Sequence, residues 1–299
     1  MRTIKGNAPA RGRNRLARLG AVCLAGALYF PGVVARAAPV DRAQLDHRTF
    51  SGIVRCMRQC DPQDAADLGL RETGLAPVFD AGLDCPGIDE GWAIDYSARR
   101  GRNARHGGID IPAARGTPIL AVADGEVVAL FDNRETAVGI RIFLQHAPEQ
   151  TGKPFWAYSE YAHLRELPPL SIGQAVRRGD VVGYTSNTGI SGAEARARAG
   201  DTSLRGVRTR RDALHFSILY SESPDYAVLP GHGGYLVPVG ARWMDPVAFF
   251  RATPPYDTPA LAALPADAKQ VAVPAMGPDG KVRPAGGRLI WPYACSLRE

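Results

Sequence analysis

The stretch Ile119-Leu-Ala-Val-Ala-Asp-Gly-Glu-Val-Val-Ala-Leu-Phe131 places two short apolar runs on either side of an Asp-Gly pair. Asp-Gly favours a turn, and β-branched and aromatic residues favour strands. Runs of the same kind recur at Ile140 to Leu144, Val181 to Tyr184 and Leu214 to Tyr220. Short strands at this spacing, across residues 91–251, predict a mainly β fold: an all-β sandwich or open barrel rather than repeated βαβ units.

Two other segments flank this β-rich part. Residues 38–90 form a lead segment with a short helical stretch, in which Phe50, Ile53, Val54 and Met57 have helical spacing. Residues 252–299 are rich in Pro, Ala and Gly and predict an extended C-terminal tail.

The N-terminus has the three parts of an export signal. Residues 1–18 carry six basic and no acidic side chains, an apolar run follows from Leu19 to Ala35, and Ala35-Arg36-Ala37 provides a small-x-small cleavage pattern. Residues 1–37 therefore predict a signal peptide, which leads to a periplasmic or extracellular protein without stable membrane insertion after cleavage. An uncleaved N-terminal anchor is the alternative, although Pro31 and Gly32 break the run and leave it short for a membrane span of about 20 residues.

The positive net charge belongs to this predicted signal segment. The 299 residues have a formal net charge of +6, and residues 1–37 contribute seven positive charges and no negative one, so the rest carries about −1. The remaining charge balance gives no reason to expect a nucleic-acid partner. The hydrophobic content of 45% and charged content of 22% are those of a globular protein and exclude a wholly disordered or fibrous chain. Oligomeric state is left open by the sequence.

Four cysteines remain after export: Cys56, Cys60, Cys85 and Cys295. An even number in an oxidising compartment predicts disulfides, and four cysteines allow three pairings. Cys56 and Cys60 are four residues apart on the helical stretch, a spacing that rarely suits a bond between them. We therefore favour bonds from this pair outward, one to Cys85 and one to Cys295. A zinc site made of cysteines is the weaker alternative, because no Cys-x-x-Cys spacing is present.

Three polar clusters stand out in the β-rich part. His106-Gly-Gly-Ile-Asp110 places an imidazole and a carboxylate four residues apart, on the same face of an extended segment. His163 lies in Tyr-Ala-His-Leu, and His215 lies in Leu-His-Phe-Ser-Ile. A lone strand histidine is more often a hydrogen-bonded core residue than a ligand. Two histidines and one carboxylate, with a fourth position left to water, nevertheless form a standard catalytic zinc site.

The order of the motifs makes this pattern specific. His106-Gly-Gly-Ile-Asp-Ile-Pro-Ala113, Gly116-Thr-Pro-Ile119 and Ala123-Asp-Gly125 resemble the first motif block of the lysostaphin-type (LytM-like) zinc endopeptidases. The later motifs follow in the family's order: Tyr161-Ala-His-Leu164, Gly173-Gln-Ala-Val176, Gly179-Asp-Val-Val-Gly183, Asn187-Thr-Gly189, Leu214-His-Phe216 and Asp245-Pro246. The resemblance covers residues 100–250. It implies a mainly antiparallel β fold with an open groove, one zinc ion held by His106, Asp110 and His215, and hydrolysis of peptide cross-links in peptidoglycan.

One residue departs from the family's His-x-His segment. The last histidine of that segment is His215, but the first position, a catalytic residue in the family, is Ala213. His163 matches the family's other non-ligand histidine and is our candidate catalytic residue. The neighbouring Asp212 would point to the opposite face of a strand and is a poor substitute. The family's Glu after Phe is Ser217 here, outside the expected metal shell.

A second departure is the segment Ile190 to Asp212, which is longer than the family's usual connection. It carries arginines at 196, 198, 205, 208, 210 and 211 and directly precedes the strand of His215. Arginine pairs well with carboxylates, so the insert could grip an anionic cell-wall polymer. The alternative is a solvated loop or a maturation-cleavage site.

Two hypotheses from different classes follow. The first is an exported zinc metallopeptidase that cleaves stem or cross-bridge peptides of peptidoglycan, with catalytic His163 and ligands His106, Asp110 and His215. The second is a degenerate domain that binds cell wall or regulates another hydrolase, and Ala213 is the feature that favours it.

Overall fold

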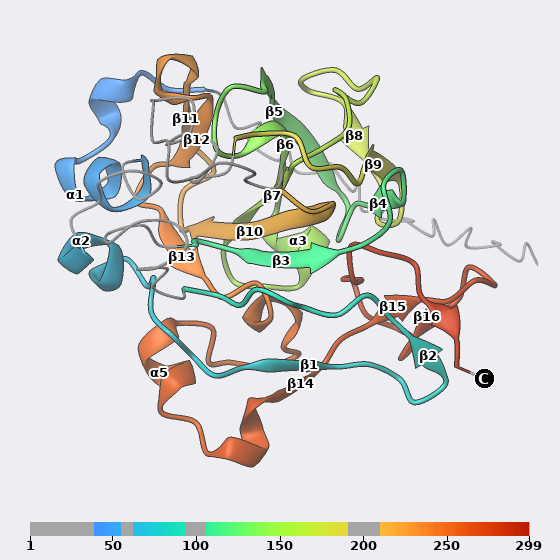
Figure 1. Cartoon of the computed structure of the whole chain (residues 1–299). Coiled ribbons are helices and arrows are strands. Elements are labelled where there is room, and N and C mark those ends of the chain that lie inside the picture. The colour runs from blue at the N-terminus through green and yellow to red at the C-terminus, as the bar shows by residue number, and fades with distance from the viewer. Residues whose placement is uncertain (1–38, 55–61, 94–105, 191–209, 299) are drawn as a thin grey trace, which may run out of the picture. The chain divides into compact units, whose positions relative to one another are not determined.

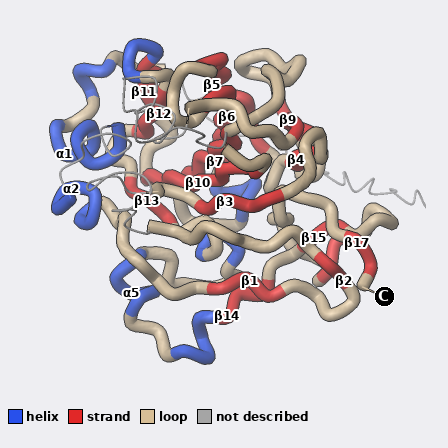
Figure 2. Tube along the Cα trace, in the orientation of Figure 1, coloured by secondary structure: helices blue, strands red, loops and turns tan. Residues whose placement is uncertain are grey.

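The computed structural model describes residues 39–54, 62–93, 106–190 and 210–298, which belong to the unit formed by residues 37–299. The predicted signal segment, Cys56, Cys60 and most of the arginine-rich insert lie outside the described residues. No helix in the described ranges is long and apolar enough to cross a membrane. Strands outnumber helices along the tube in Figure 2, and the predicted mainly β class is confirmed.

The centre of this unit is a seven-stranded antiparallel sheet. Its strand order is β13-β10-β7-β6-β5-β8, and β3 also pairs with β10 (Figure 1). The bounds are β3 (Ile109–Pro112), β5 (Gly125–Asn133), β6 (Gly139–His146), β7 (Trp156–Ala162), β8 (Ala175–Val176), β10 (Ala213–Ser221) and β13 (Arg242–Met244). The turn predicted at Asp124-Gly125 leads directly into β5.

In the described ranges, five two-stranded sheets accompany this one. They are β1 (Ala76–Val78) with β14 (Gln270–Ala272), β2 (Leu83–Asp84) with β17 (Ser296–Leu297), β4 (Pro118–Leu120) with β9 (Val181–Tyr184), β11 (Tyr226–Leu229) with β12 (Tyr235–Pro238), and β15 (Ala275–Met276) with β16 (Val282–Arg283). The short α-helices are α1 (His47–Thr49), α2 (Pro62–Asp67), α3 (Pro148–Thr151) and α5 (Thr258–Ala262), and a π-helical turn, Phe50–Val54, continues α1. The predicted helical stretch of the lead segment is therefore present up to Val54.

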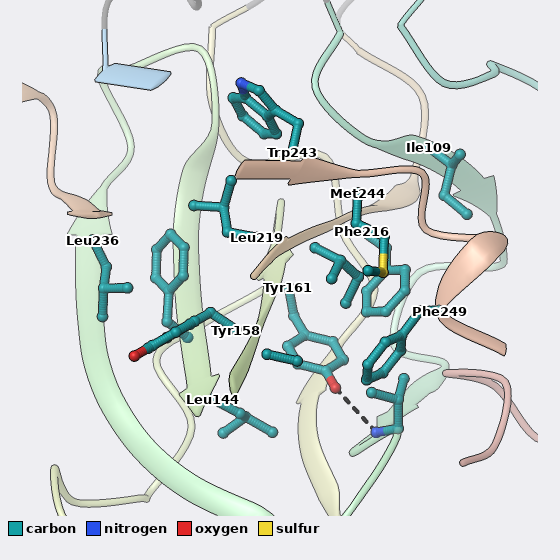
Figure 3. Close-up of a cluster of buried hydrophobic side chains, with 14 of the residues drawn as sticks. Ile109, Leu144, Tyr158, Tyr161, Phe216, Leu219, Leu236, Trp243, Met244 and Phe249 are labelled. Carbon is teal, nitrogen blue, oxygen red and sulfur yellow. Dashed lines mark hydrogen bonds between the residues drawn. The ribbon is translucent and has the colours of Figure 1, made fainter. Parts of the chain in front are cut away.

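The core packs on both faces of the central strands β6 and β10. Figure 3 shows aromatic and aliphatic side chains from β6, β7, β10 and β13 together, with Tyr161 and Phe216 in ring contact at 5.4 Å between centroids. The hydroxyl of Tyr161 accepts a hydrogen bond from the backbone N–H of Val122 at 3.0 Å, so even the polar tip of this ring is satisfied. Continuous burial along β6 and β10 explains why these strands read as apolar runs rather than alternating ones.

The C-terminal tail pairs along its length with the lead segment and the sheet. In Figure 1, β14 runs beside β1, and in Figure 2, β17 lies near β2, with which it pairs. Trp291 and Tyr293 are fully buried, and the Tyr293 hydroxyl lies 2.6 Å from the Thr185 hydroxyl oxygen. Large aromatic residues drive this packing, because each one removes a large apolar area from water when it is buried. The Pro and Gly residues of the tail have little apolar area of this kind.

Our favoured disulfide pairing is wrong. Cys85 is bonded to Cys295, so neither can bond to Cys56 or Cys60. The antiparallel pairing of β2 with β17 brings the two cysteines together, with a Cα–Cα distance of 4.4 Å across 210 residues of sequence. Spacing along the chain could not reveal this partner, because the pairing of two two-residue strands determines it.

His146 is a buried core histidine at the end of β6. Its Nδ1–H donates to the carbonyl oxygen of Asp124 and its Nε2 accepts from the Ser159 hydroxyl, both at 2.7 Å. Burial lowers the pKa of His146 from 6.5 to about 4, because the hydrogen bond to the Asp124 carbonyl and the charge of the Asp124 carboxylate offset only part of the cost of charging the buried ring.

The His146 imidazole should make stability depend on pH. The unfolded chain takes up the proton near pH 6.5 and the folded chain only near pH 4, so the free energy of unfolding should fall by about 3 kcal/mol as pH drops through this window. Urea unfolding between pH 7 and 4 should give a flatter profile for His146→Asn than for the wild type. Parallel profiles for the two proteins would contradict this assignment.

Candidate metal centre

The centre is built where β3 and β10 pair. Their antiparallel register sets His215 directly opposite Asp110, and β7 on the other side of β10 sets Ala162 opposite the same histidine. His106 comes three residues before β3 begins. The single-strand geometry expected for His106 and Asp110 is therefore replaced by a turn, because Gly107 has φ +71°, but the two side chains still meet.

Three ligand-type atoms converge in this centre. Nε2 of His106 lies 2.9 Å from Oδ1 of Asp110. Nδ1 of His215 lies 3.0 Å from Nε2 of His106 and 3.1 Å from Oδ1 of Asp110. The three side chains are almost fully buried. Burial alone would raise the pKa of the Asp110 carboxyl, but His106 and His215 outweigh it and hold this pKa well below its usual range. The centre therefore presents a carboxylate to two imidazoles.

The spacing of these atoms suits a small metal ion. Nitrogen and oxygen ligands of tetrahedral zinc lie about 2.0–2.2 Å from the ion, which puts neighbouring ligand atoms about 3.4 Å apart. The three distances of 2.9 to 3.1 Å need only a small expansion to reach that value. Two imidazole nitrogens and one carboxylate oxygen thus fit a metal ion both in chemistry and in geometry.

A backbone carbonyl group fixes the ring of His106. Nδ1–H of His106 donates to the carbonyl oxygen of Gly91 at 3.0 Å, which leaves Nε2 with its lone pair toward Asp110. The lead segment reaches this position because Asp110 exchanges backbone hydrogen bonds with Asp89 and Glu90. The residue directly after the lead segment thus contributes a positioning group to the centre, and sequence reasoning missed it because a backbone carbonyl leaves no side-chain signal.

Gly108 is required by close packing. A Cβ built on Gly108 would lie 2.7 Å from Cε1 of His215 and 2.7 Å from the carbonyl oxygen of Phe216. Any other residue would displace the ring of His215 or separate the paired strands β3 and β10. Gly108 therefore allows the backbone to approach the ring of a ligand candidate closely.

His163 lies beside this cluster, immediately after β7. Its φ of +64° is unusual for a residue with a side chain, and this conformation turns the chain at the strand end, with the His163 ring 5.9 Å from that of His215. Nδ1–H donates to the carbonyl oxygen of Thr188 at 2.9 Å, so Nε2 carries the lone pair. Burial, together with the charge of Arg210, holds the pKa of His163 well below its ordinary value, and the ring is neutral.

Ala213 and the end of the insert complete the surroundings. Ala213 is buried on the same face of β10 as His215, and its methyl group offers no polar atom. Arg210 enters instead: Nη1 lies 2.7 Å from Nε2 of His163 and 3.9 Å from Oδ2 of Asp110. Arg211 Nη2 lies 3.8 Å from the same Oδ2. Sequence reasoning placed both arginines at the rim and missed the contact of Arg210 with His163, which no spacing rule indicates.

The remaining candidates lie elsewhere. Asp212 pairs with Arg115 at 3.3 Å and does not reach the centre. Asp245 is buried against Thr73 and accepts a hydrogen bond from the backbone of Val247, and burial raises its pKa to about 6. Ser217 donates to Glu160 at 2.8 Å, beside the buried Arg141–Glu160 ion pair. These residues stabilise the sheet and its connection to the lead segment, away from the histidine cluster.

Comparison with known sequences identifies the domain. Residues 104–224 match the model of peptidase family M23. This segment, less than half of the chain, is thus similar in sequence to M23 metallopeptidases. The match spans β3 to β10 and therefore contains all three ligand candidates and His163. It confirms the family predicted from the motif order.

Individual relatives resemble only part of the chain. An uncharacterized metalloprotease of Haemophilus influenzae is 33% identical over 91 residues, which are 30% of this chain and 17% of that protein. The chain thus spans less than a fifth of this relative's length.

Among solved structures, similar chains include a zinc-containing peptidase from Vibrio cholerae, at 22% identity and a TM-score of 0.32, covering 48% of this chain and 36% of the other. The catalytic domain of lysostaphin from Staphylococcus simulans has 23% identity and a TM-score of 0.29, covering 42% and 75%.

Proposed function

We propose that this protein is an exported zinc metallopeptidase that hydrolyses peptide bonds in the stem or cross-bridge peptides of peptidoglycan. The convergence of His106, Asp110 and His215 within hydrogen-bonding distance of one another is the observation that carries the proposal. A pure binding module has no physical need for a complete, buried ligand set. The motif order of residues 100–250 supports a peptidoglycan substrate, as it resembles that of enzymes acting on this polymer.

Export is supported by two independent features. The N-terminal residues have the composition of a signal peptide. Cys85 and Cys295 form a disulfide, and such bonds persist in oxidising compartments such as the periplasm or the extracellular space. A peptidase delivered there would meet the cell wall directly.

The residues around the centre divide the chemistry between them. A zinc ion supplies polarisation of the scissile carbonyl group and a water of lowered pKa. His106, Asp110 and His215 would hold the ion, with the Gly91 carbonyl orienting the first of them. His163 keeps an unprotonated Nε2 directed at the centre, because its Nδ1–H is engaged with Thr188. That atom can accept a proton from the attacking water, a contribution typically worth about 10²- to 10⁴-fold.

A second candidate function rests on Ala213. Without the family's first histidine the domain could retain the fold and the ion while binding cell wall or regulating another hydrolase. The buried methyl group of Ala213 makes no polar contact to replace that histidine. This hypothesis predicts zinc binding and sacculus binding without hydrolysis, so the two functions separate experimentally.

Incubation of the exported protein with purified peptidoglycan sacculi tests the first function. We expect release of peptide-containing fragments, detected by mass spectrometry, that stops when a chelator removes the ion and resumes when zinc is restored. Glycan strands should stay intact, since the cut is in the peptide. Stoichiometric zinc and sacculus binding with no release would contradict the peptidase and favour the binding module.

A further inference from the structure

Arg210 occupies the side of the centre that Ala213 leaves without a polar group. Its Nη1 is 2.7 Å from Nε2 of His163, and its side chain is only 11% exposed. Arg210 lies three residues before Ala213, at the end of the chain segment that leads into β10. The guanidinium group of Arg210 also faces Oδ2 of Asp110, so two groups of the centre hold it in this position.

Two contacts fix Arg210 at its two ends. The side-chain amide of Asn187 donates to the carbonyl oxygen of Arg210 at 3.0 Å, and Nη2 of Arg210 donates to the carbonyl oxygen of Ala137 at 3.3 Å. Asn187 is in turn an acceptor for Arg115, which pairs with Asp212. Asn187, in the loop after β9, therefore holds the backbone of Arg210, and Ala137, in the turn between β5 and β6, holds its guanidinium group.

The chemistry of the guanidinium group determines which role it can take. It stays protonated in proteins and donates hydrogen bonds only, so Arg210 cannot accept a proton as a histidine does. It can stabilise a negative oxygen, and a positioned donor of this kind typically contributes about 10²- to 10³-fold to turnover. Oδ1 of Asp110 faces the two ligand histidines whereas Oδ2 faces Arg210, so the guanidinium group flanks the ion site without displacing a ligand atom.

We propose that Arg210 supplies the hydrogen-bond donor that the Ala213 position lacks, and that it binds the carbonyl oxygen of the scissile peptide as that oxygen becomes negative. This inference rests on the proposed peptidase function. As the water oxygen bonds to the carbonyl carbon, its proton passes to Nε2 of His163 and the π electrons move to the carbonyl oxygen. The N–H of Arg210 that now points at Nε2 turns to this oxygen. The C=O bond re-forms as the C–N bond breaks, and the proton passes to the leaving nitrogen.

Arg210→Ala tests the role, with Arg165→Ala as matched control. Arg165 is two residues from His163, but its guanidinium group pairs with Glu166 on the surface. We expect Arg210→Ala to lower kcat about 10²- to 10³-fold with little change in KM and with a full zinc content. Arg165→Ala should match the wild type. An unchanged kcat in Arg210→Ala would overturn the proposal. An increased kcat would overturn it as well, because it would mean that Arg210 obstructs the centre.

Two further measurements separate a direct role from a structural one. Arg210→Ala combined with Ala213→His should recover most of the lost turnover, because the family's own donor is restored; failure to recover counts against the proposal. Calorimetry with a phosphinate peptide, which imitates the tetrahedral state, should show affinity falling with kcat, whereas affinity for the cleaved peptide stays constant. Equal losses for both ligands would indicate a structural effect and overturn the proposal.

The design also distinguishes failure of this inference from failure of the peptidase function. A wild type that releases nothing from sacculi refutes the peptidase, and phosphinate binding still reports on Arg210. Where Arg210→Ala does not fold, Arg210→Met keeps the length and apolar stem of the side chain and is measured in its place.

Discussion

His106→Ala is expected to abolish both stable zinc binding and peptide hydrolysis, whereas His163→Ala should keep the ion and lose about 10²- to 10⁴-fold in turnover. Among the described residues, His106 supplies one of the three ligand-type atoms that converge in the centre, and its Nε2 contacts both of the others. Removing an outer-shell partner of a ligand typically costs about 10- to 100-fold in metal affinity, so loss of the ligand itself should cost at least that much.

Zinc content after dialysis and competition with a chromophoric chelator measure the first effect, and fragment release from sacculi measures the second. His47→Ala is a suitable control, because His47 is an exposed residue of α1. Two results would refute the assignment. One is full zinc content in His106→Ala. The other is unchanged turnover in His163→Ala, which would remove His163 from the mechanism.

The parts of the centre that could be predicted from sequence are those with a local signal. The strand around His215 is a continuous apolar run, and its predicted bounds differ from β10 by one residue at each end. The turn at Asp124-Gly125 and strand β9 follow from Gly, Asp and β-branched residues in the same way. The role of His106, Asp110, His163 and His215 as a group came from motif order, and the structure brings the four side chains together.

The parts that could not be predicted depend on long-range pairing. The register that sets His215 opposite Asp110 joins residues more than a hundred positions apart. The carbonyl of Gly91 reaches His106 only because the lead segment hydrogen-bonds alongside β3. Arg210 was counted among the insert's charges, since nothing in its spacing shows that a loop residue turns inward toward His163.

Cys85→Ser combined with Cys295→Ser is expected to lower the free energy of unfolding by up to about 5 kcal/mol. The bond closes a loop across 210 residues of sequence, and the chain-entropy estimate for a loop of that size is about 5 kcal/mol at 25 °C. Urea unfolding of oxidised wild type and double variant measures the difference. A loss below about 1 kcal/mol would mean that the pairing of β2 with β17 and the buried tail hold these segments without the bond.

Peptide mapping under non-reducing conditions provides the control for this prediction. The peptides of Cys85 and Cys295 should be recovered joined, and recovery of either joined to Cys56 or Cys60 would contradict the pairing. The bond also bears on the centre, because Cys85 is six residues before Gly91, whose carbonyl oxygen orients His106. We therefore expect the double variant to bind zinc more weakly than the wild type, but by less than His106→Ala, since Asp110 still pairs with Glu90 beside Gly91.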